Sequence, residues 1–405
     1  MTPKAHLLGT HRAVPLAETV ARLRPLMPAL GITRLADVTG LDRIGVPVFQ
    51  AVRPLSRSVS VSQGKGLDAD AARASALMEA AETWHAERAE PPLRLARERD
   101  LRERRLAVVD TGALPRVAGS AYDPGTSILW AEGRGLATGE AAWLPFELVH
   151  TDYTLPLPAG SGRFVASTNG LASGNVWGEA VCHALCELIE RDAVTLWFRS
   201  GARGQAASAV DLATVDDPAC RATLDRVHAA GFDLAAWDAT GDLGVPTFLC
   251  LLVDARDPEG GHGGLGAGCH PAREVAFLRA LTEAVQVRMT YISGARDDIG
   301  TAEYTAGVRA ERLAKARRLV ARRDESARDF RALPTRAHPD FDADLAWLLE
   351  RVAAVGLGEP VAVDLSRPEV GIAVARVAVP GLESPDDQPG YTPGRRALDA
   401  AAGRA

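Results

Sequence analysis

An eight-residue pattern occurs three times in the sequence, and each copy carries acidic or amide side chains at the same positions. The copies, about a hundred residues apart, are Ser75-Ala-Leu-Met-Glu79-Ala-Ala-Glu82, His183-Ala-Leu-Cys-Glu187-Leu-Ile-Glu190 and Arg279-Ala-Leu-Thr-Glu283-Ala-Val-Gln286. At about 100° per residue, the first, fifth and eighth positions of a helix lie within roughly 60° of one another. Each copy therefore predicts a narrow polar stripe on an otherwise apolar helix.

The stripes carry negative charges close together, on helices whose composition predicts burial. A helix that is apolar nearly all round normally lies in the protein interior, where carboxylates need a partner. Two carboxylates about 4 Å apart repel by roughly 4 kcal/mol at an effective dielectric of about 20, so a cation must lie between them or one must stay protonated. The alternative is a solvated face, although such faces usually interleave Lys or Arg with their acids.

The ligand types favour magnesium. Mg²⁺ prefers oxygen ligands, typically one or two carboxylates, and completes its shell with water and substrate phosphates. Zinc is not expected, because Cys182, His183 and Cys186 have no C-x₂-C pair beside them and Cys269 lies far downstream. The residues alone thus predict a magnesium-nucleotide site.

Further groups suited to a triphosphate accompany the three patterns. Gln63-Gly64-Lys65-Gly66 is a glycine turn after a strand, although the P-loop spacing is absent. The polar run from Ser167 to Glu179, which includes Asn175, leads into the second helix, and helix entries favour anions. Any single arginine is more often a surface or ion-pair residue than a phosphate ligand. The candidate cations are Arg12, Arg191, Arg279 and Arg288.

Composition excludes several classes of protein. The 405 residues are 47% hydrophobic and 24% charged, which is typical of a globular protein with an ample core. A net charge of −6 offers no basic surface for nucleic acid. The amino terminus lacks a signal pattern and no apolar run approaches a membrane span, so we expect a cytoplasmic protein. Five cysteines fit reduced thiols better than a disulfide framework.

The elements that must position these residues alternate between strands and helices. Hydrophobic periodicity predicts strands at Val59–Ser62 and within Gly45–Val52, Gly244–Val253 and Gly371–Val379. It predicts helices at Ala17–Arg24, Asp70–Glu87, Trp177–Phe198, Glu274–Thr290, Arg309–Ala332 and Asp340–Val355. The tail after Glu383 has little apolar periodicity and is expected to be mobile. We expect one large α/β domain with mixed sheets, packed helices and internal pseudo-repeats.

The combination of motifs strongly resembles the YcaO family over roughly residues 9 to 396. Beside the three acidic patterns, it includes Thr168-Asn169-Gly170, Glu190-Arg191-Asp192 and a closing Val379-Pro-Gly-Leu-Glu383. The resemblance implies ATP- and Mg²⁺-dependent phosphorylation of a peptide backbone amide oxygen, followed by loss of phosphate to give an azoline, a thioamide or an amidine. It implies three parts: an N-terminal part of the fold at residues 1–55, the ATP-binding catalytic domain at 56–385, and a tail at 386–405.

The resemblance also implies roles for individual residues. Glu187, Glu190 and Arg191 are the expected catalytic residues. The expected metal ligands are Glu79, Glu82, Glu179, Glu187 and Glu190. The remaining residues of the expected nucleotide site are Lys65, Ser75, Asn175, Gln286 and Arg288. Where the family often has arginine after the second acid of the first motif, this chain has Thr83, so another residue must supply any phosphate contact there.

The end of the sequence favours one type of YcaO-like protein over the others. The absence of a Pro-x-Pro-x-Pro ending disfavours azoline formation, and the chain looks more like stand-alone members that make thioamides with a TfuA-like partner. A homodimer and a peptide or protein substrate are also implied. The alternatives are an azoline-forming cyclodehydratase and a non-catalytic nucleotide-binding accessory subunit. None of the five cysteines is expected to be catalytic, and Cys269, beside His270, is the one most worth testing.

Overall fold

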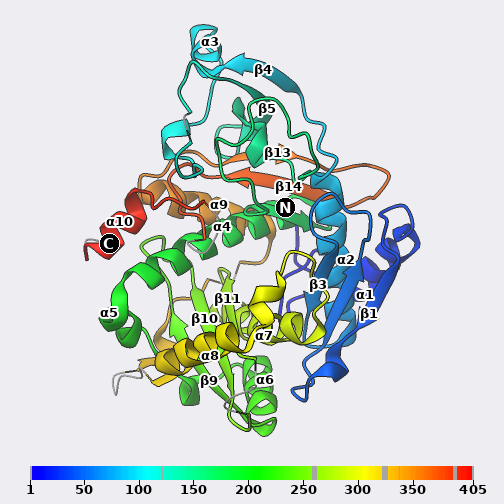
Figure 1. Cartoon of the computed structure of the whole chain (residues 1–405), viewed down its shortest axis with the longest axis vertical. Coiled ribbons are helices and arrows are strands. Elements are labelled where there is room, and N and C mark those ends of the chain that lie inside the picture. The colour runs from blue at the N-terminus through cyan, green and yellow to red at the C-terminus, as the bar shows by residue number, and fades with distance from the viewer. Residues whose placement is uncertain are drawn as a thin grey trace.

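The computed structural model describes residues 2–120, 122–257, 262–321, 327–336, 338–385 and 390–403. Three larger sheets surround a long central helix, α4 (Trp177–Arg199), which contacts the sheet above it and the sheet below it in Figure 1. Within the described ranges, no helix has the length and apolarity needed to cross a bilayer.

The first sheet is antiparallel and is formed near the N-terminus. Its order is β1-β2-β3, from strands β1 (Arg34–Asp37), β2 (Val48–Val52) and β3 (Val61–Lys65). Helix α2 (Ala69–Ala86) packs on β2 and β3, and α1 (Leu16–Leu23) packs on α2. The Asp68 side chain begins α2 by accepting the Ala71 N–H at 2.8 Å.

The largest sheet has six strands paired in antiparallel fashion. Its order is β4-β5-β13-β14-β7, with β6 paired to β5. The strands are β4 (Leu93–Arg97), β5 (Ser127–Gly135), β6 (Ala141–Pro145), β7 (Leu171–Gly174), β13 (Val361–Asp364) and β14 (Ala373–Ala378). Helix α4 covers β7 and β14.

The third sheet supports the helix that carries the third acidic pattern. Its antiparallel order is β11-β10-β9, from β9 (Phe232–Asp238), β10 (Thr247–Asp254) and β11 (Gly264–Cys269). Helix α7 (Arg273–Ser293) packs on β11 and β10, and α6 (Pro218–Ala229) packs on β9 and α7. A short parallel pair joins β8 (Val210–Asp211) to β12 (Arg328–Asp329).

The remaining helices and turns lie between and after these sheets. The other helices are α3 (Glu98–Glu103), α5 (Gly201–Ala207), α8 (Ala306–Ala321), α9 (Phe341–Ala354) and α10 (Arg395–Ala401). The 3₁₀ turns are Arg24–Leu26, Thr39–Leu41, Thr111–Ala113, Phe146–Leu148, Leu212–Thr214, Thr301–Tyr304 and Phe330–Ala332.

The three acidic patterns lie in repeated strand-glycine-helix units. The pairs are β3 with α2, β7 with α4, and β11 with α7. A Cβ added at Gly64, Gly174 or Gly266 would lie 2.1, 2.5 or 2.2 Å from a backbone nitrogen of the helix packed against it. Glycine is therefore required where each helix presses on its strand. The expected single α/β domain, with several sheets and packed helices, is confirmed.

Two expectations about the later part of the chain differ from the structure. The helix expected at Arg309–Ala332 begins earlier, at Ala306, and ends at Ala321, while Arg328–Asp329 form β12. Residues 395–401, in the tail expected to be mobile, form helix α10, because Arg396 donates to Asp192 of α4 at 2.8 and 2.9 Å. Residues 322–326, 386–389, 404 and 405, which belong to these two expectations, lie outside the described residues.

Candidate functional site

The three acidic patterns converge on one cavity of about 390 Å³. Helices α2, α4 and α7 supply most of its wall, and β3, β7, Leu16 of α1 and the segments around Thr10 and Arg296 supply the rest. Eight of the eleven residues expected in the site line this cavity: Lys65, Ser75, Glu79, Glu82, Glu187, Glu190, Arg191 and Gln286.

Backbone N–H groups of three strands hold three of the acids in place. Glu79 accepts from the amide of Gln63 on β3 at 3.3 Å. Glu82 accepts from Ser173 on β7 at 2.7 Å. Glu190 accepts from Cys269 at the end of β11 at 3.0 Å. Each acid is fixed through one oxygen, and the other oxygen of Glu190 lies 3.4 Å from Arg191 Nη1.

The carboxylates of the first two patterns have too few cations near them to balance their negative charge. Burial raises the pKa of Glu79 and of Glu190, and raises the pKa of Glu187 to about 7. Burial, followed by repulsion from Glu187 and Glu79, raises the pKa of Glu82 well above its ordinary value. A cation placed among these carboxylates would reverse the shifts.

Glu283 of the third pattern behaves in the opposite way. Its carboxylate lies 2.9 Å from the Lys65 ammonium. Burial opposes its ionisation, but attraction to Lys65 and Arg191 outweighs burial and lowers the pKa of Glu283. The charge of Glu283 is therefore already balanced by Lys65, whereas the acids of the first two patterns still need a cation.

Several polar atoms at the cavity are buried without a hydrogen-bond partner among the described residues. They are Gln286 Oε1, Gln63 Nε2 and Arg279 Nε. Gln286 donates through its Nε2 to the Gln63 carbonyl at 3.1 Å, so its amide is oriented while its oxygen is unsatisfied. Such atoms are expensive to leave unpaired, and a bound polar ligand would satisfy them. Oxygen-rich acids, cations and unsatisfied amides together fit a nucleotide with Mg²⁺.

The sequence matches the family described as YcaO cyclodehydratase, ATP- and Mg²⁺-binding, over residues 63–383. The chain belongs to the YcaO family. ATP and Mg²⁺ are the cofactors that this family binds.

Two similar proteins match nearly the whole chain. An uncharacterized protein in the tfuA 3' region of Rhizobium leguminosarum bv. trifolii is 38% identical over 381 residues, covering 92% of this chain and 88% of that protein. An uncharacterized protein of Methanothermobacter thermautotrophicus is 35% identical over 377 residues, covering 92% of this chain and 95% of its own.

Solved structures confirm the YcaO fold. YcaO from Methanopyrus kandleri, bound with AMPPCP and Mg²⁺, has a TM-score of 0.72 at 23% identity and covers 98% of this chain and 99% of its own. A heterocyclase in complex with substrate and cofactor has a TM-score of 0.78 at 24% identity and covers all of this chain. This chain spans 56% of that heterocyclase.

Two of the residues expected in the YcaO site do not line the cavity but hold the N-terminal segment beside it. Glu179 accepts from Arg12 Nη1 and from the Ala13 amide, both at 2.9 Å. Asn175 donates to Glu179 at 3.2 Å and accepts from the Thr19 hydroxyl at 2.9 Å. Their polar groups are already paired, and it is Arg12 that lines the cavity.

Arg288, the third residue outside the cavity, is engaged elsewhere. Its Nε donates to Asp42 at 2.8 Å, its guanidinium lies 3.7 Å from Asp254, and the same group stacks over the Phe232 ring at 4.7 Å. These partners satisfy its charge away from the nucleotide cavity.

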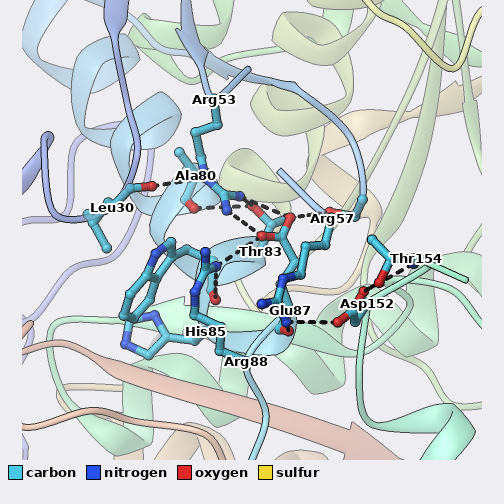
Figure 2. A network of polar contacts seen from close by, with 12 residues as sticks. Leu30, Arg53, Arg57, Ala80, Thr83, His85, Glu87, Arg88, Asp152 and Thr154 are labelled. Carbon is cyan, nitrogen blue, oxygen red and sulfur yellow. Dashed lines mark hydrogen bonds and ion pairs between the residues drawn. The ribbon is translucent and has the colours of Figure 1, made fainter. Parts of the chain in front are cut away.

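Thr83, where the family often has arginine, belongs to a buried network at the end of α2 (Figure 2). Arg53 donates to Thr83 Oγ1 at 2.9 Å and forms a buried ion pair with Glu87. This arginine does not line the cavity, so it contributes no phosphate contact there.

Two further arginines near the acids were not predicted from the sequence. Arg296 lines the cavity and attracts Glu79, while its side chain donates to Asp298 at 2.8 Å. Arg376 on β14 is buried, donates to the Ser167 carbonyl at 2.7 Å and interacts electrostatically with Glu187 and Glu82. Arg376 could have been suspected from the sequence, because it is a charged residue within the otherwise apolar strand Ala373–Ala378.

Proposed function

We propose that this chain uses ATP and Mg²⁺ to activate a backbone amide of a peptide or protein, most specifically to form a thioamide. The observation that supports this most directly is the convergence of Glu79, Glu82, Glu187 and Glu190 on one cavity of a YcaO-family chain. A carboxylate cluster with raised pKa values beside unpaired amide atoms is suited to a metal-bound nucleotide.

The cavity residues divide into three roles in this proposal. Glu79, Glu82, Glu187 and Glu190 hold Mg²⁺. Lys65, Arg191, Arg279 and Arg296 attract the phosphates. Ser75 and Gln286 bind polar atoms of the nucleotide, with Gln286 Oε1 positioned to accept a hydrogen bond.

An amide needs this help because it is a poor electrophile and its oxygen is a poor leaving group. Bound ATP supplies the phosphoryl group that makes the oxygen able to leave, and Mg²⁺ offsets the charge on that group. The walls of the cavity position the reactants and limit water. Glu187, whose pKa is about 7, releases its proton when a cation binds.

A relative's name supports the thioamide product. The Rhizobium leguminosarum relative is named for its position in the tfuA 3' region, which fits the TfuA-like partner implied by the sequence. The partner would supply the sulfur nucleophile or present the peptide, while this chain supplies the phosphorylation site.

The first test measures ATP turnover with candidate peptides, sulfide and a TfuA-like partner. Glu187→Gln and Glu190→Gln should each lower Mg²⁺-dependent turnover by roughly 10- to 100-fold or more, because each replaces a charged cation ligand with a neutral amide. The control Glu350→Gln changes an exposed acid on α9 and should stay near wild type.

Product mass discriminates the remaining activities. Exchange of oxygen for sulfur indicates a thioamide, whereas loss of water indicates an azoline. Unchanged turnover in both glutamine variants would refute the site, and tight ATP binding with no phosphate release under any condition would indicate an accessory subunit.

A further inference from the structure

A second cavity, of about 40 Å³, lies next to the nucleotide cavity. Ser167 and Asn169 line the second cavity, whereas Thr168 between them lines the nucleotide cavity. On α4, Leu188 lines the second cavity and Glu187 lines the nucleotide cavity. Because consecutive Cα atoms are only about 3.8 Å apart, a wall about one residue thick separates the two cavities.

Arg376 of β14 is the charged residue in this wall. It is 2% exposed, and its Nη2 donates to the Ser167 carbonyl at 2.7 Å. The same guanidinium interacts electrostatically with Glu187 and Glu82 of the nucleotide cavity. Its Nη1 is buried, and no described residue accepts a hydrogen bond from it. A buried N–H without an acceptor is costly, so we expect a bound group to accept from Arg376 Nη1.

An acceptor without a donor belongs to the same cavity. Asn169 Oδ1 is buried, and no group among the described residues donates to it. The backbone N–H of Asn169 donates to Ser167 Oγ at 3.2 Å, so the local backbone is held without this side-chain oxygen. Much of the remaining wall is apolar and includes Leu148, Val165 and Leu188. The second cavity therefore offers one donor and one acceptor in largely apolar surroundings.

This pair of atoms discriminates among small ligands. An anion would satisfy Arg376 but would face the Asn169 oxygen, and a cation would face the Arg376 guanidinium. The carboxylate of Glu383, which also lines the cavity, already accepts the N–H groups of Gly394 and Ala397, both at 2.9 Å. A peptide bond carries one acceptor and one donor. The cavity admits roughly three water-sized groups, at about 10–15 Å³ each, which matches the carbon, oxygen and nitrogen atoms of one peptide bond.

We propose that the second cavity binds a backbone amide of the peptide substrate, with Arg376 Nη1 donating to its carbonyl oxygen and Asn169 Oδ1 accepting its N–H. This inference rests on the proposed peptide-modifying function. Thr168 is exposed, so an incoming chain can cross the wall there and place a neighbouring amide in the nucleotide cavity. Two hydrogen bonds to the backbone orient the reacting amide and accept different side chains at the bound position.

The first test compares KM values for a peptide that supports turnover. Asn169→Ala should raise the KM for the peptide by about 3- to 10-fold, the value of one hydrogen bond, while the KM for ATP stays within about twofold. Asn169→Asp, whose carboxylate would pair with Arg376 Nη1 and close the site, should raise it further. Asn169→Ala should not lower the free energy of unfolding, because the lost oxygen has no partner among the described residues. The control Thr138→Ala changes an exposed residue that lines neither cavity.

A change in the substrate locates the same hydrogen bond. Replacing one peptide N–H at a time with an ester oxygen removes the donor and keeps the shape of the chain. At one position this replacement should raise the KM for the peptide in the wild type and should add nothing in Asn169→Ala. Additive effects of the ester and Asn169→Ala at every position, or equal rises in the KM values for peptide and ATP in Asn169→Ala, would overturn the assignment.

A further measurement does not depend on catalysis. Crystals soaked in N-acetylglycine N-methylamide, a small compound with two peptide bonds, should show one of these bonds between Asn169 and Arg376 in the wild type and none there in Asn169→Asp. Water alone in the second cavity of the wild type, at molar concentrations of the compound, would overturn the assignment. If the compound binds there but no peptide stimulates ATP turnover, only the proposed function fails.

Discussion

The chemistry of the site depends on how individual carboxylates are held. Glu79, Glu82 and Glu190 each accept one backbone N–H, so their orientation is set by strands rather than by solvent. Fixing like charges close together costs free energy in the metal-free protein, and that cost is recovered when a cation binds. The site is therefore preorganised for a cation at the expense of stability without one.

This arrangement gives a pH dependence whose sign can be worked out for Glu187. Its pKa is about 7 in the folded protein and about 4.3 in an unfolded chain. Between these values the unfolded chain releases a proton that the folded protein keeps, so stability without metal falls as pH rises and the loss is complete above about pH 7. Glu187→Gln mimics the protonated group and should match wild type at pH 4.5.

At pH 8 in EDTA, Glu187→Gln should instead be more stable than wild type by on the order of 1–3 kcal/mol. Urea unfolding of both proteins across this pH range measures the difference. A constant difference between the two proteins at all pH values would contradict the raised pKa.

At the scale of elements, three strand-glycine-helix units set the spacing of the acids. A Cβ at Gly266 would lie 2.2 Å from the Ala284 nitrogen, so Gly266→Ala must push α7 away from β11. We expect the free energy of unfolding to fall by about 2 kcal/mol or more. Gly300→Ala is the control, because nothing lies within 4 Å of the added Cβ. Equal stability of the two variants would show that the close approach is not required.

The buried ion pair at the end of α2 is a second element-scale feature. Arg53 and Glu87 have side-chain exposures of 3% and 0%, so removing the arginine alone leaves the buried Glu87 carboxylate with only Arg88, at 3.2 Å, and the Ser58 hydroxyl as partners (Figure 2). Arg53→Met should cost about 1–3 kcal/mol in urea unfolding, because Arg88 still compensates part of the charge. Adding Glu87→Leu should recover much of that loss. A cost below about 1 kcal/mol for Arg53→Met would mean that water or rearrangement compensates Glu87.

Local patterns predicted the elements that carry the site well. The helix expected at Asp70–Glu87 is α2 (Ala69–Ala86), and that expected at Trp177–Phe198 is α4 (Trp177–Arg199). The strand expected at Val59–Ser62 lies later, at Val61–Lys65, because its pairing with β2 decides its register. Periodicity reports which face is buried but not which distant partner a strand will meet.

Partners far apart in the chain explain what the sequence could not predict in the site. Arg288 follows the third acidic pattern by two residues and was expected in the nucleotide site, yet it donates to Asp42, 246 positions away, outside the cavity. Arg296 follows α7 with no motif of its own but lines the cavity. Glu82 meets the β7 amide of Ser173 only because α2 and β7 pack together. Such pairings depend on the tertiary fold, which a single sequence does not specify by spacing.

At the scale of the whole molecule, the residues that line the cavity range from Leu8 to Arg296, so the nucleotide should be held by segments that are far apart in the sequence. The homodimer implied by family resemblance stays a prediction. The central claim is that glutamates from α2 and α4 bind one or more divalent cations in this cavity.

A crystal structure with AMPPCP and Mn²⁺ in place of Mg²⁺ tests that claim most directly, since anomalous scattering locates the metal. We predict manganese in the cavity, with oxygens of at least two among Glu79, Glu82, Glu187 and Glu190 at about 2.0–2.3 Å, as hard carboxylate ligands require. Manganese bound elsewhere, or bound in the cavity without any of these carboxylates, would contradict the account.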